Sequence, residues 1–368
     1  MMTSTVLVMM MILPGLALFY GGLTRAKNML SVMTQIGAVA CLAMLIWVMY
    51  GYSLAFGPDV AGGGVLTNFI ASFDKAFLKG VTAASQSATF TAGVEIPEYV
   101  FICFQMTFAA ITVALVLGSV VERMKFSAVM AFGAVWLTIV YFPIAHMVWA
   151  SSGLFFKAGA LDFAGGTVVH INAGVSALVA SLMLGKRMGY PNTPMPPHSL
   201  TLTGVGTGLL WVGWFGFNAG SALEANGSAG LAMINTFVAT ASGGLFWMLI
   251  ERVRGHKGSA LGFCSGIVAG LVAVTPAAGN SGPFGAIVLG AVASVVCFFA
   301  VSVLKPKLGY DDALDAFGIE AVATTIVWAS IGTVIAITIA KLLTGLRVSP
   351  EVEQEGLDLG EHGERAYN

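Results

Sequence analysis

The stretch GGTVVHINAG, residues 165–174, begins one of the most apolar parts of the chain and places His170 about one turn into it. The whole chain is 57% hydrophobic and 10% charged, with a mean hydropathy of +0.87, whereas soluble domains carry roughly 25% charged residues. So few charges cannot cover a water-facing surface. Because its apolar stretches reach the roughly 20 residues of a membrane-spanning helix, the sequence predicts an all-α, polytopic membrane protein.

Ten apolar segments are expected to cross the membrane as helices, because hydrocarbon requires every backbone polar group to be paired inside the protein. They lie at residues 1–23, 31–57, 98–121, 126–149, 167–185, 199–220, 226–250, 258–278, 283–304 and 320–346. The first has no charged leader and no small-residue cleavage site, so we expect a spanning helix, clipped at its start, rather than a signal peptide. Residues 1–346 are taken as the membrane domain and residues 347–368 as a C-terminal tail.

Positive charges fall in alternate loops when the N-terminus is placed outside. The charged loops carry Arg25 and Lys27, then Arg123 and Lys125, then Lys186 and Arg187, then Arg252, Arg254 and Lys257, then Lys305 and Lys307. The intervening loops hold few, chiefly Lys75, Lys79 and Lys157. Since cytoplasmic loops are rich in Lys and Arg, we expect a multi-pass protein of the inner (plasma) membrane with these loops in the cytoplasm.

The charge pattern breaks at the last segment. Lys305 and Lys307 are expected inside, and only segment 320–346 follows them. One crossing would put the tail outside, yet Lys341 and Arg347 beside it favour the inside. Either the rule fails once, or a spanning segment is missing near residue 319.

Charge and cysteine content argue against several classes of protein. The net charge of −1 provides no basic surface for a nucleic-acid partner. The four cysteines all lie in apolar segments and are expected to be buried hydrophobic groups rather than disulfides or metal ligands; they are Cys41, Cys103, Cys264 and Cys297. We expect no metal and no cofactor. An intramembrane enzyme would need a paired nucleophile or metal ligands, so an enzyme is not expected.

Two polar residues near the start of segment 167–185 are candidates for function. His170 is either a helix-packing histidine or part of a pathway. Ionisable groups inside membranes usually line pathways or relay protons, and a neutral imidazole offers one donor and one acceptor, so we interpret His170 as a pathway residue. Asp162 is either a helix-start carboxylate, favoured by the helix dipole, or a group that stabilises cations at a pore entrance; we favour the structural role.

Aromatic residues form the third signal. Phe104 and Phe108 are separated by one helical turn in FICFQMTFAAI, so their rings share one face. Trp149 in HMVWASSG stands at a membrane edge, where an interfacial aromatic belt alone would explain it. The stretch WVGWFGFNAGSA, residues 211–222, is the densest, although its glycines also suit close helix packing; its aromatic residues are Trp211, Trp214, Phe215 and Phe217.

These motifs together resemble the Amt/Rh ammonium transporter family, on the bacterial Amt side. The matching strings extend over nearly the whole chain and are PGLALFYGGLTRAKN (14–28), WVMYGYSLAFG (47–57), PIAHMVWA (143–150), LDFAGGTVVHINAG (161–174), WFGFNAGSA (214–222), SGIVAGLVAVTPAAG (265–279) and GLDLGEHGERAYN (356–368). The resemblance implies eleven helices in two inverted five-helix halves, a homotrimer with one pore in each subunit, and a cytoplasmic tail that contacts a PII-type (GlnK-like) regulator.

The resemblance also implies site residues and a function. Phe108, Trp149 and Ser221 would form an outer recruitment site for ammonium, with Asp162 as its structural support. The residues of the gate and pore would be Phe104, Phe108, Phe217, Trp214 and His170. The implied function is to recruit ammonium, deprotonate it and conduct ammonia through a hydrophobic pore, with a possible separate path for the proton.

The sequence departs from the family where a second pore histidine is expected. The string DAFGI ends at Ile319, and Glu320 follows instead of histidine, so helix ten is apparently missing between these two residues. Either the natural protein has residues here that this sequence lacks, or the gene has a true deletion. A true deletion would leave one pore histidine and predicts crippled or altered transport. A weak repeat, ALDFAGG (160–166) and ALDAFGI (313–319), is the only other sign of the two halves.

Two other functions remain open. A membrane sensor would bind ammonium and signal through residues 347–368, with transport impaired by the missing histidine. The second open function is conduction of a neutral gas in the manner of the Rh branch. Trp149 argues against it, because Trp149 suggests a cation site, which a channel for a neutral gas does not need.

Overall fold

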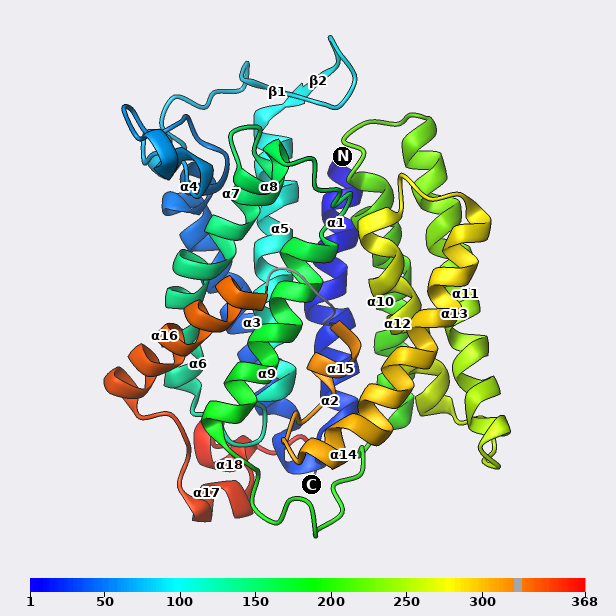
Figure 1. The fold of residues 1–368 in the computed structure, drawn as a ribbon. Helices are drawn as coiled ribbons and strands as arrows, with labels where there is room; N and C mark the ends of the chain where they lie inside the picture. The colour runs from blue at the N-terminus through cyan, green and yellow to red at the C-terminus, as the bar shows by residue number, and fades with distance from the viewer. Residues whose placement is uncertain (321–325, 368) are drawn as a thin grey trace.

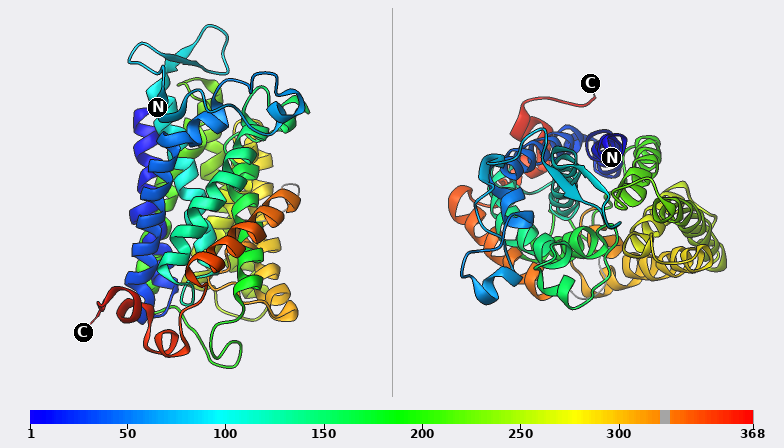
Figure 2. Two further views of the ribbon diagram at one scale, coloured as in Figure 1. Left: turned by 90° about the vertical axis from the view of Figure 1, so that its left-hand side faces the viewer. Right: turned by 90° about the horizontal axis from the view of Figure 1, so that it is seen from above.

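Long apolar helices dominate the structure, a computed structural model that describes residues 1–320 and 326–367. Within those residues, nine helical segments are long and apolar enough to cross a membrane, and they coincide with the first nine predicted segments. Figures 1 and 2 show them side by side in one bundle. The predicted polytopic, helical fold is therefore confirmed.

Each spanning segment is one helix or several joined by short turns. The segments are Met2–Leu23, Ala26–Phe56, Glu98–Ser119, Phe126–Lys157, Gly166–Leu184, Leu200–Gly220, Gly227–Val253, Ala260–Ala277 and Pro283–Leu308. Their helices are α1 (Met2–Met10), α2 (Ala17–Leu23), α3 (Met29–Ile46), α4 (Tyr52–Phe56), α5 (Glu98–Val116), α6 (Phe126–Trp136), α7 (Phe142–Trp149), α8 (Leu154–Lys157), α9 (Asn172–Leu184), α10 (Leu200–Gly220), α11 (Gly227–Val253), α12 (Ala260–Val274), α13 (Pro283–Phe299) and α14 (Lys305–Leu308).

Wider, π-helical turns join several of these helices, and one of them, η8, leads from a loop into α9. They are η1 (Met11–Leu16), η3 (Trp47–Gly51), η7 (Leu137–Tyr141), η8 (Gly166–Ile171) and η10 (Ala300–Leu304). The turn η1 contains Pro14. Proline has no amide hydrogen to donate, and its ring clashes with the preceding turn of a regular α-helix, so a wider turn suits this position. The turn η8 contains His170, and π-helical turns often occur at functional positions.

A small β-sheet is the one exception to the all-helical prediction among the described residues. Strands β1 (Gln86–Ala88) and β2 (Glu95–Pro97) pair antiparallel, with Ser87 opposite Ile96. Figure 1 shows the sheet beyond the end of the bundle, above α5. It belongs to the polar connection between α4 and α5, where no apolar pattern predicted structure.

Small residues allow the later helices to pack closely. A Cβ atom added at Gly266 of α12 would lie 2.5 Å from the carbonyl oxygen of Gly243 in α11, so any side chain there would push the two helices apart. In membranes, where hydrophobic attraction between helices is weak, such close backbone contact is a main source of packing energy. Figure 2 shows α10 to α13 gathered on one side of the bundle.

The tenth predicted segment follows a different path from a simple crossing. Helix α15 (Ala316–Glu320) enters the bundle from the end that carries α14, and α16 (Ile326–Thr344) slants back toward that same end (Figure 1). Only residues 321–325 separate the two helices, too few for another spanning helix. Helix ten of the family pattern is therefore absent here, as the sequence predicted.

Contacts along α16 agree with this path. Inside the bundle, the hydroxyl of Thr333 accepts a hydrogen bond from the indole of Trp136 at 3.2 Å. At the helix end, the carbonyl of Thr344 accepts one from Lys125, in a basic loop, at 3.3 Å. Helices α15 and α16 thus form a re-entrant pair, a structure tolerated at membrane depth where protein surrounds it. Within the described residues, the C-terminal end of α16 therefore lies beside a basic loop, which agrees with the charge pattern that favoured this side for the tail.

A buried ion cluster ties together the loops at this end of the bundle, which we call the basic end. The guanidinium of Arg187 donates to Asp311 at 2.8 Å and to Glu122 at 3.1 Å. Arg25 also pairs with Glu122, at 2.7 Å, and the buried guanidinium of Arg123 donates to the carbonyl of Asp311 at 2.6 Å. Four loops that are distant in sequence therefore meet in one network.

The charges in this network keep its carboxylates ionised. Burial alone raises the pKa of Glu122, but the neighbouring charges of Arg187 and Arg25 outweigh burial and lower the pKa to about 2. Burial likewise opposes ionisation of Asp311, and its hydrogen bonds and charge attraction to Arg187 lower its pKa below the ordinary value. Each acid thus depends on an arginine from another loop.

The C-terminal tail packs against the basic end. Its helices are α17 (Pro350–Glu355) and α18 (Leu357–His362). Glu353 pairs with Arg347 at 2.7 Å and accepts a hydrogen bond from the amide of Met188 at 2.5 Å. Asp358 accepts one from the amide of Ser31 at 2.8 Å. The tail therefore lies on the same side of the bundle as the basic loops.

Replacing Arg187 with methionine should destabilise the basic end. The substitution leaves the buried carboxylates of Glu122 and Asp311 without their shared partner, which should lower the free energy of unfolding by about 3 kcal/mol. Thermal and denaturant unfolding in detergent measure the loss. The matched control is Arg252→Met, at an exposed arginine that has no ion pair in the described part of the chain. Equal stability of the two variants would contradict a structural role for the cluster.

Candidate functional site

An aromatic cavity opens at the end of the bundle opposite to the basic end. We call it the entrance cavity; its lining includes Phe108, Trp149 and Ser221, and also Asp162. The ring of Phe108 meets Trp149 edge to face, with centroids 5.8 Å apart. The hydroxyl of Ser221 donates to the carbonyl of Phe217 at 2.8 Å, so its oxygen keeps lone pairs free to accept. Two ring systems and one acceptor therefore face the same space.

Asp162 organises the backbone beside this cavity. Its carboxylate accepts hydrogen bonds from the amides of Gly165, Thr167 and Val168 at 2.9, 3.1 and 3.1 Å. Burial raises the pKa of Asp162, although these backbone donors lower it. Its own carbonyl accepts from the indole of Trp149 at 3.0 Å. Both oxygens of the carboxylate accept hydrogen bonds from backbone amides. This arrangement is consistent with the structural role that the sequence favoured for Asp162.

The glycine pair before His170 permits this local structure. Gly165 has φ +109°, a left-handed conformation in which an L side chain is strained. The turn η8 then begins with its amides directed at Asp162, and the chain continues into α9. His170 follows one turn later, at 2% exposure.

Two stacked phenyl rings close the inner end of the entrance cavity. The centroids of Phe108 and Phe217 are 4.2 Å apart, with the planes inclined by 23°. Phe108 lines the entrance cavity and Phe217 lines a second cavity deeper in the bundle, so the rings separate the two spaces. Phe104 meets the edge of Phe108 at 4.9 Å but is fully buried and lines neither cavity.

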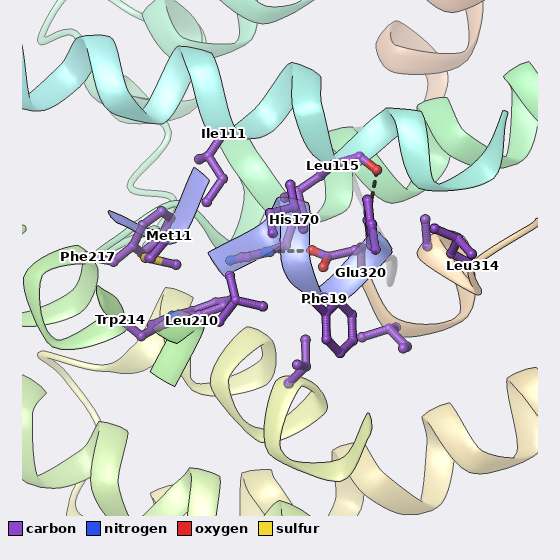
Figure 3. Close-up of a pocket in the computed structure, with 15 residues that line it drawn as sticks. Met11, Phe19, Ile111, Leu115, His170, Leu210, Trp214, Phe217, Leu314 and Glu320 are labelled. Atoms are coloured by element: carbon purple, nitrogen blue, oxygen red, sulfur yellow. Dashed lines mark hydrogen bonds and ion pairs between the residues drawn. The ribbon is translucent and has the colours of Figure 1, made fainter. Parts of the chain in front are cut away.

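The second cavity, here called the central cavity, is small and largely apolar. It holds about 20 Å³ of space for a water-sized molecule, enough for about one such molecule. Met11, Ile111, Leu115, Leu210 and Leu314 supply apolar walls (Figure 3). A hydrated ion does not fit a space of this size and polarity.

Trp214 forms a rigid wall of the central cavity. The ring of His170 stacks on it with centroids 5.3 Å apart and planes inclined by only 9°. The indole of Trp214 donates to the hydroxyl of Thr275 at 2.9 Å, and that hydroxyl contacts Asn218 at 3.3 Å. The orientation of the tryptophan, and with it that of the imidazole, is therefore set by hydrogen bonds.

The polar centre of the cavity is a histidine–carboxylate contact. Nδ1 of His170 lies 2.5 Å from a carboxylate oxygen of Glu320. Both side chains are buried, at 2% and 5% exposure. The other ring nitrogen, Nε2, has no hydrogen-bond partner among the described residues. One imidazole nitrogen is thus occupied by the carboxylate, while the other remains available to a molecule in the cavity.

Helices entering from opposite ends of the bundle create this contact. The segment η8–α9 starts near the entrance cavity, and α15 starts at the basic end and packs directly against α9 (Figure 1). Each start is held by a carboxylate: Asp162 at the first, and Asp312 at the second, where it accepts from the amide of Phe317 at 2.7 Å. The two helix starts run in opposite directions, but Asp312 stands just before the repeat string ALDAFGI (313–319), in which Asp315 is the counterpart of Asp162.

The structure divides the predicted site residues between two neighbouring cavities, except Phe104, which lines neither. Phe108, Trp149, Ser221 and Asp162 line the entrance cavity, and Phe217, Trp214 and His170 line the central cavity. The sequence did not predict that Glu320 would contact His170. The only signal was its position directly after DAFGI, where a histidine was expected.

Comparison with known proteins identifies a family. The sequence model of the Ammonium Transporter Family matches residues 1–326 and, in a second match, residues 319–367. An ammonium transporter of Aquifex aeolicus (strain VF5) is 43% identical over 407 aligned positions, which cover 100% of this chain and 92% of that protein. The alignment is longer than the 368 residues of this chain, and the family match divides where the sequence predicted an interruption.

Solved structures resemble the same fold. The crystal structure of Saccharomyces cerevisiae Mep2 superposes with a TM-score of 0.80 at 32% identity, covering 94% of this chain and 88% of that one. A structure titled Sensor Amt Protein superposes with a TM-score of 0.83 at 25% identity, covering 98% of this chain and 96% of that one.

Removing the Asp162 carboxylate should destabilise the start of η8. Asp162→Ala leaves three backbone amides without their acceptor, which should lower the free energy of unfolding by about 2 kcal/mol or more. Unfolding monitored by tryptophan fluorescence measures the change. Asp59→Ala, at an exposed carboxylate with no hydrogen bond in the described part of the chain, is the control and should cost less than about 0.5 kcal/mol. If the two variants are equally stable, Asp162 does not support this segment.

Proposed function

This chain belongs to the ammonium transporter family, and from that premise we propose that it recruits ammonium at the entrance cavity, removes one proton and conducts ammonia past His170. The stacked pair of Phe108 and Phe217 is the observation that carries this proposal. It lies between a cavity suited to a cation and a cavity with room for about one water-sized molecule, so the substrate must lose its hydration on passing the rings and its charge in the second cavity.

Recruitment depends on the aromatic faces. An ammonium ion over the rings of Phe108 and Trp149 gains about 0.5–2 kcal/mol, depending on how far it is desolvated. It also donates a hydrogen bond to the oxygen of Ser221. These contacts favour a small cation with N–H donors, and they sit at the point where the pathway narrows.

The apolar path beyond the rings favours neutral ammonia. Carrying the charged ion through it would cost on the order of tens of kcal/mol by the idealised Born estimate. Potassium has the same charge but no proton to release, so it cannot take the neutral route. Selectivity therefore follows from the chemistry of the substrate, not from pore diameter alone. Nε2 of His170, which has no partner among the described residues, is a polar atom available to ammonia in the central cavity.

We further propose the cellular arrangement that the family implies. The chain is a homotrimer in the inner (plasma) membrane, with the entrance cavity outside and the basic end in the cytoplasm. The basic loops support this orientation, and the packing of the tail against them keeps the tail on the cytoplasmic side, available to a PII-type regulator. The chemistry is limited to reversible proton transfer, so the protein is a transporter and not an enzyme.

A sensor is the second candidate function. Similarity to the structure titled Sensor Amt Protein and the close packing of the tail on the basic loops favour it. A sensor would bind ammonium at the same entrance cavity without sustained flux, so measurement of binding and flux on the same preparation separates the two functions.

Substitution of Trp149 tests recruitment. Trp149→Leu removes one cation–π face and should raise the ammonium concentration for half-maximal current about 5- to 30-fold. Purified protein in liposomes on a solid-supported membrane provides the current. Trp211→Leu is the control, because Trp211 lines neither the entrance nor the central cavity. An unchanged half-saturation in Trp149→Leu, or the same shift in both variants, would contradict a recruitment role for Trp149.

A further inference from the structure

The carboxylate of Glu320 is an isolated charge at the centre of the bundle. Its side chain is 5% exposed, and the one interaction described for it is the 2.5 Å contact with His170. The residues that line the central cavity include no lysine or arginine. Two titratable neighbours are uncharged when protonated: Tyr20, whose hydroxyl donates to the carbonyl of Leu115 at 3.0 Å, and Cys297, whose thiol lies 3.9 Å from the carbonyl of Ile319. Among the described residues, no other ion pair or hydrogen bond compensates the charge of this carboxylate.

A buried, uncompensated carboxylate is costly. Transfer of a carboxylate from water to an apolar interior costs several kcal/mol even after relaxation, so the cavity gains stability when a proton neutralises it. The contact with Nδ1 of His170 connects the carboxylate to the imidazole. The opposite nitrogen, Nε2, is buried and without a partner among the described residues, and Figure 3 shows the ring between Glu320 and the side of the cavity near Phe217. A proton taken up at Nε2 therefore makes the imidazole a cation directly beside the carboxylate, and the two charges attract each other.

We propose that Glu320 supplies the charge that makes the His170–Glu320 pair the proton acceptor for ammonium, in place of a second histidine. The inference rests on the proposed transport function. In this step an N–H bond of ammonium breaks and an Nε2–H bond forms on His170. The proton between Nδ1 and the carboxylate stays within their short contact. The charge of the pair changes from −1 to 0, the substrate becomes neutral ammonia, and the total charge is conserved. The pair then releases this proton to the separate path toward the basic end and returns to −1, so one charge crosses with each ammonia and a current flows.

Charge balance is the reason for assigning this role to a carboxylate. A lone imidazole that accepts a proton becomes a buried cation, whereas the His170–Glu320 pair becomes neutral. Since burial penalises net charge, proton transfer into the pair is favoured over transfer to a lone imidazole. Glu320 does not touch the substrate, so it acts through the orientation and charge state of His170.

The test compares variants of Glu320 in liposomes. Glu320→Gln keeps the size of the side chain and removes its charge, and it should lower the ammonium-driven current about 100-fold. Glu320→Leu should do the same, and because an apolar group suits this cavity, it serves as the uncharged variant if the glutamine variant fails to fold. Glu320→His restores a proton-accepting group and should keep the current within about tenfold of the wild type.

Each result has a defined meaning. Half-saturation by ammonium should stay unchanged in the histidine variant, because the entrance cavity is untouched, and a melting temperature near that of wild type excludes misfolding. Wild-type current in a folded Gln or Leu variant overturns the role of Glu320 but leaves the transport function standing. A wild-type protein that binds ammonium and passes no current overturns the transport function itself. Loss of current in the Gln, Leu and His variants alike reduces Glu320 to a structural residue.

Discussion

The cost of net charge inside an apolar bundle is the constraint on which the rest of this structure depends. At the basic end, arginines and acids from separate loops are buried only as pairs, with Arg187 bridging Glu122 and Asp311. In the centre, the buried carboxylate of Glu320 lies against His170. Between the two cavities, the stacked rings of Phe108 and Phe217 present apolar surface. The same physical cost therefore organises the loops and pairs the central residues, and in the proposed function it selects the form in which the substrate passes.

The region around Glu320 shows how the fold accommodates the loss of a helix from the family pattern. Helices α15 and α16 enter and leave at the basic end, so the tail keeps its place against the basic loops. The tip of α15 still reaches His170, because Asp312 holds its first turn as Asp162 holds the start of η8. The position opposite His170 is thus occupied by a titratable carboxylate. The centre therefore holds two titratable groups, His170 and Glu320, although it has only one histidine among the described residues.

Much of this architecture could be predicted from the sequence, and the limits have physical reasons. The lengths of the apolar stretches predict the nine spans of the described residues. The distribution of Lys and Arg predicts that the basic loops share one end of the bundle. The clustering of Phe108, Trp149 and Ser221 came from the family resemblance, since no local pattern brings together three residues from different helices. The contact between His170 and Glu320 joins residues 150 positions apart and depends on α15 stopping inside the bundle. Hydropathy measures apolar length and cannot distinguish a re-entrant helix from a crossing one, which is why segment 320–346 was expected to cross.

The central claim is that this chain, with the helix missing, moves ammonium by way of neutral ammonia. The most direct measurement is the current that the unmodified protein generates in liposomes when ammonium or potassium is applied at equal concentration. A saturable current with ammonium and none with potassium is the predicted result, since only ammonium can transfer a proton to His170. Equal currents for both ions, or no current with either while ammonium still binds, would contradict the account.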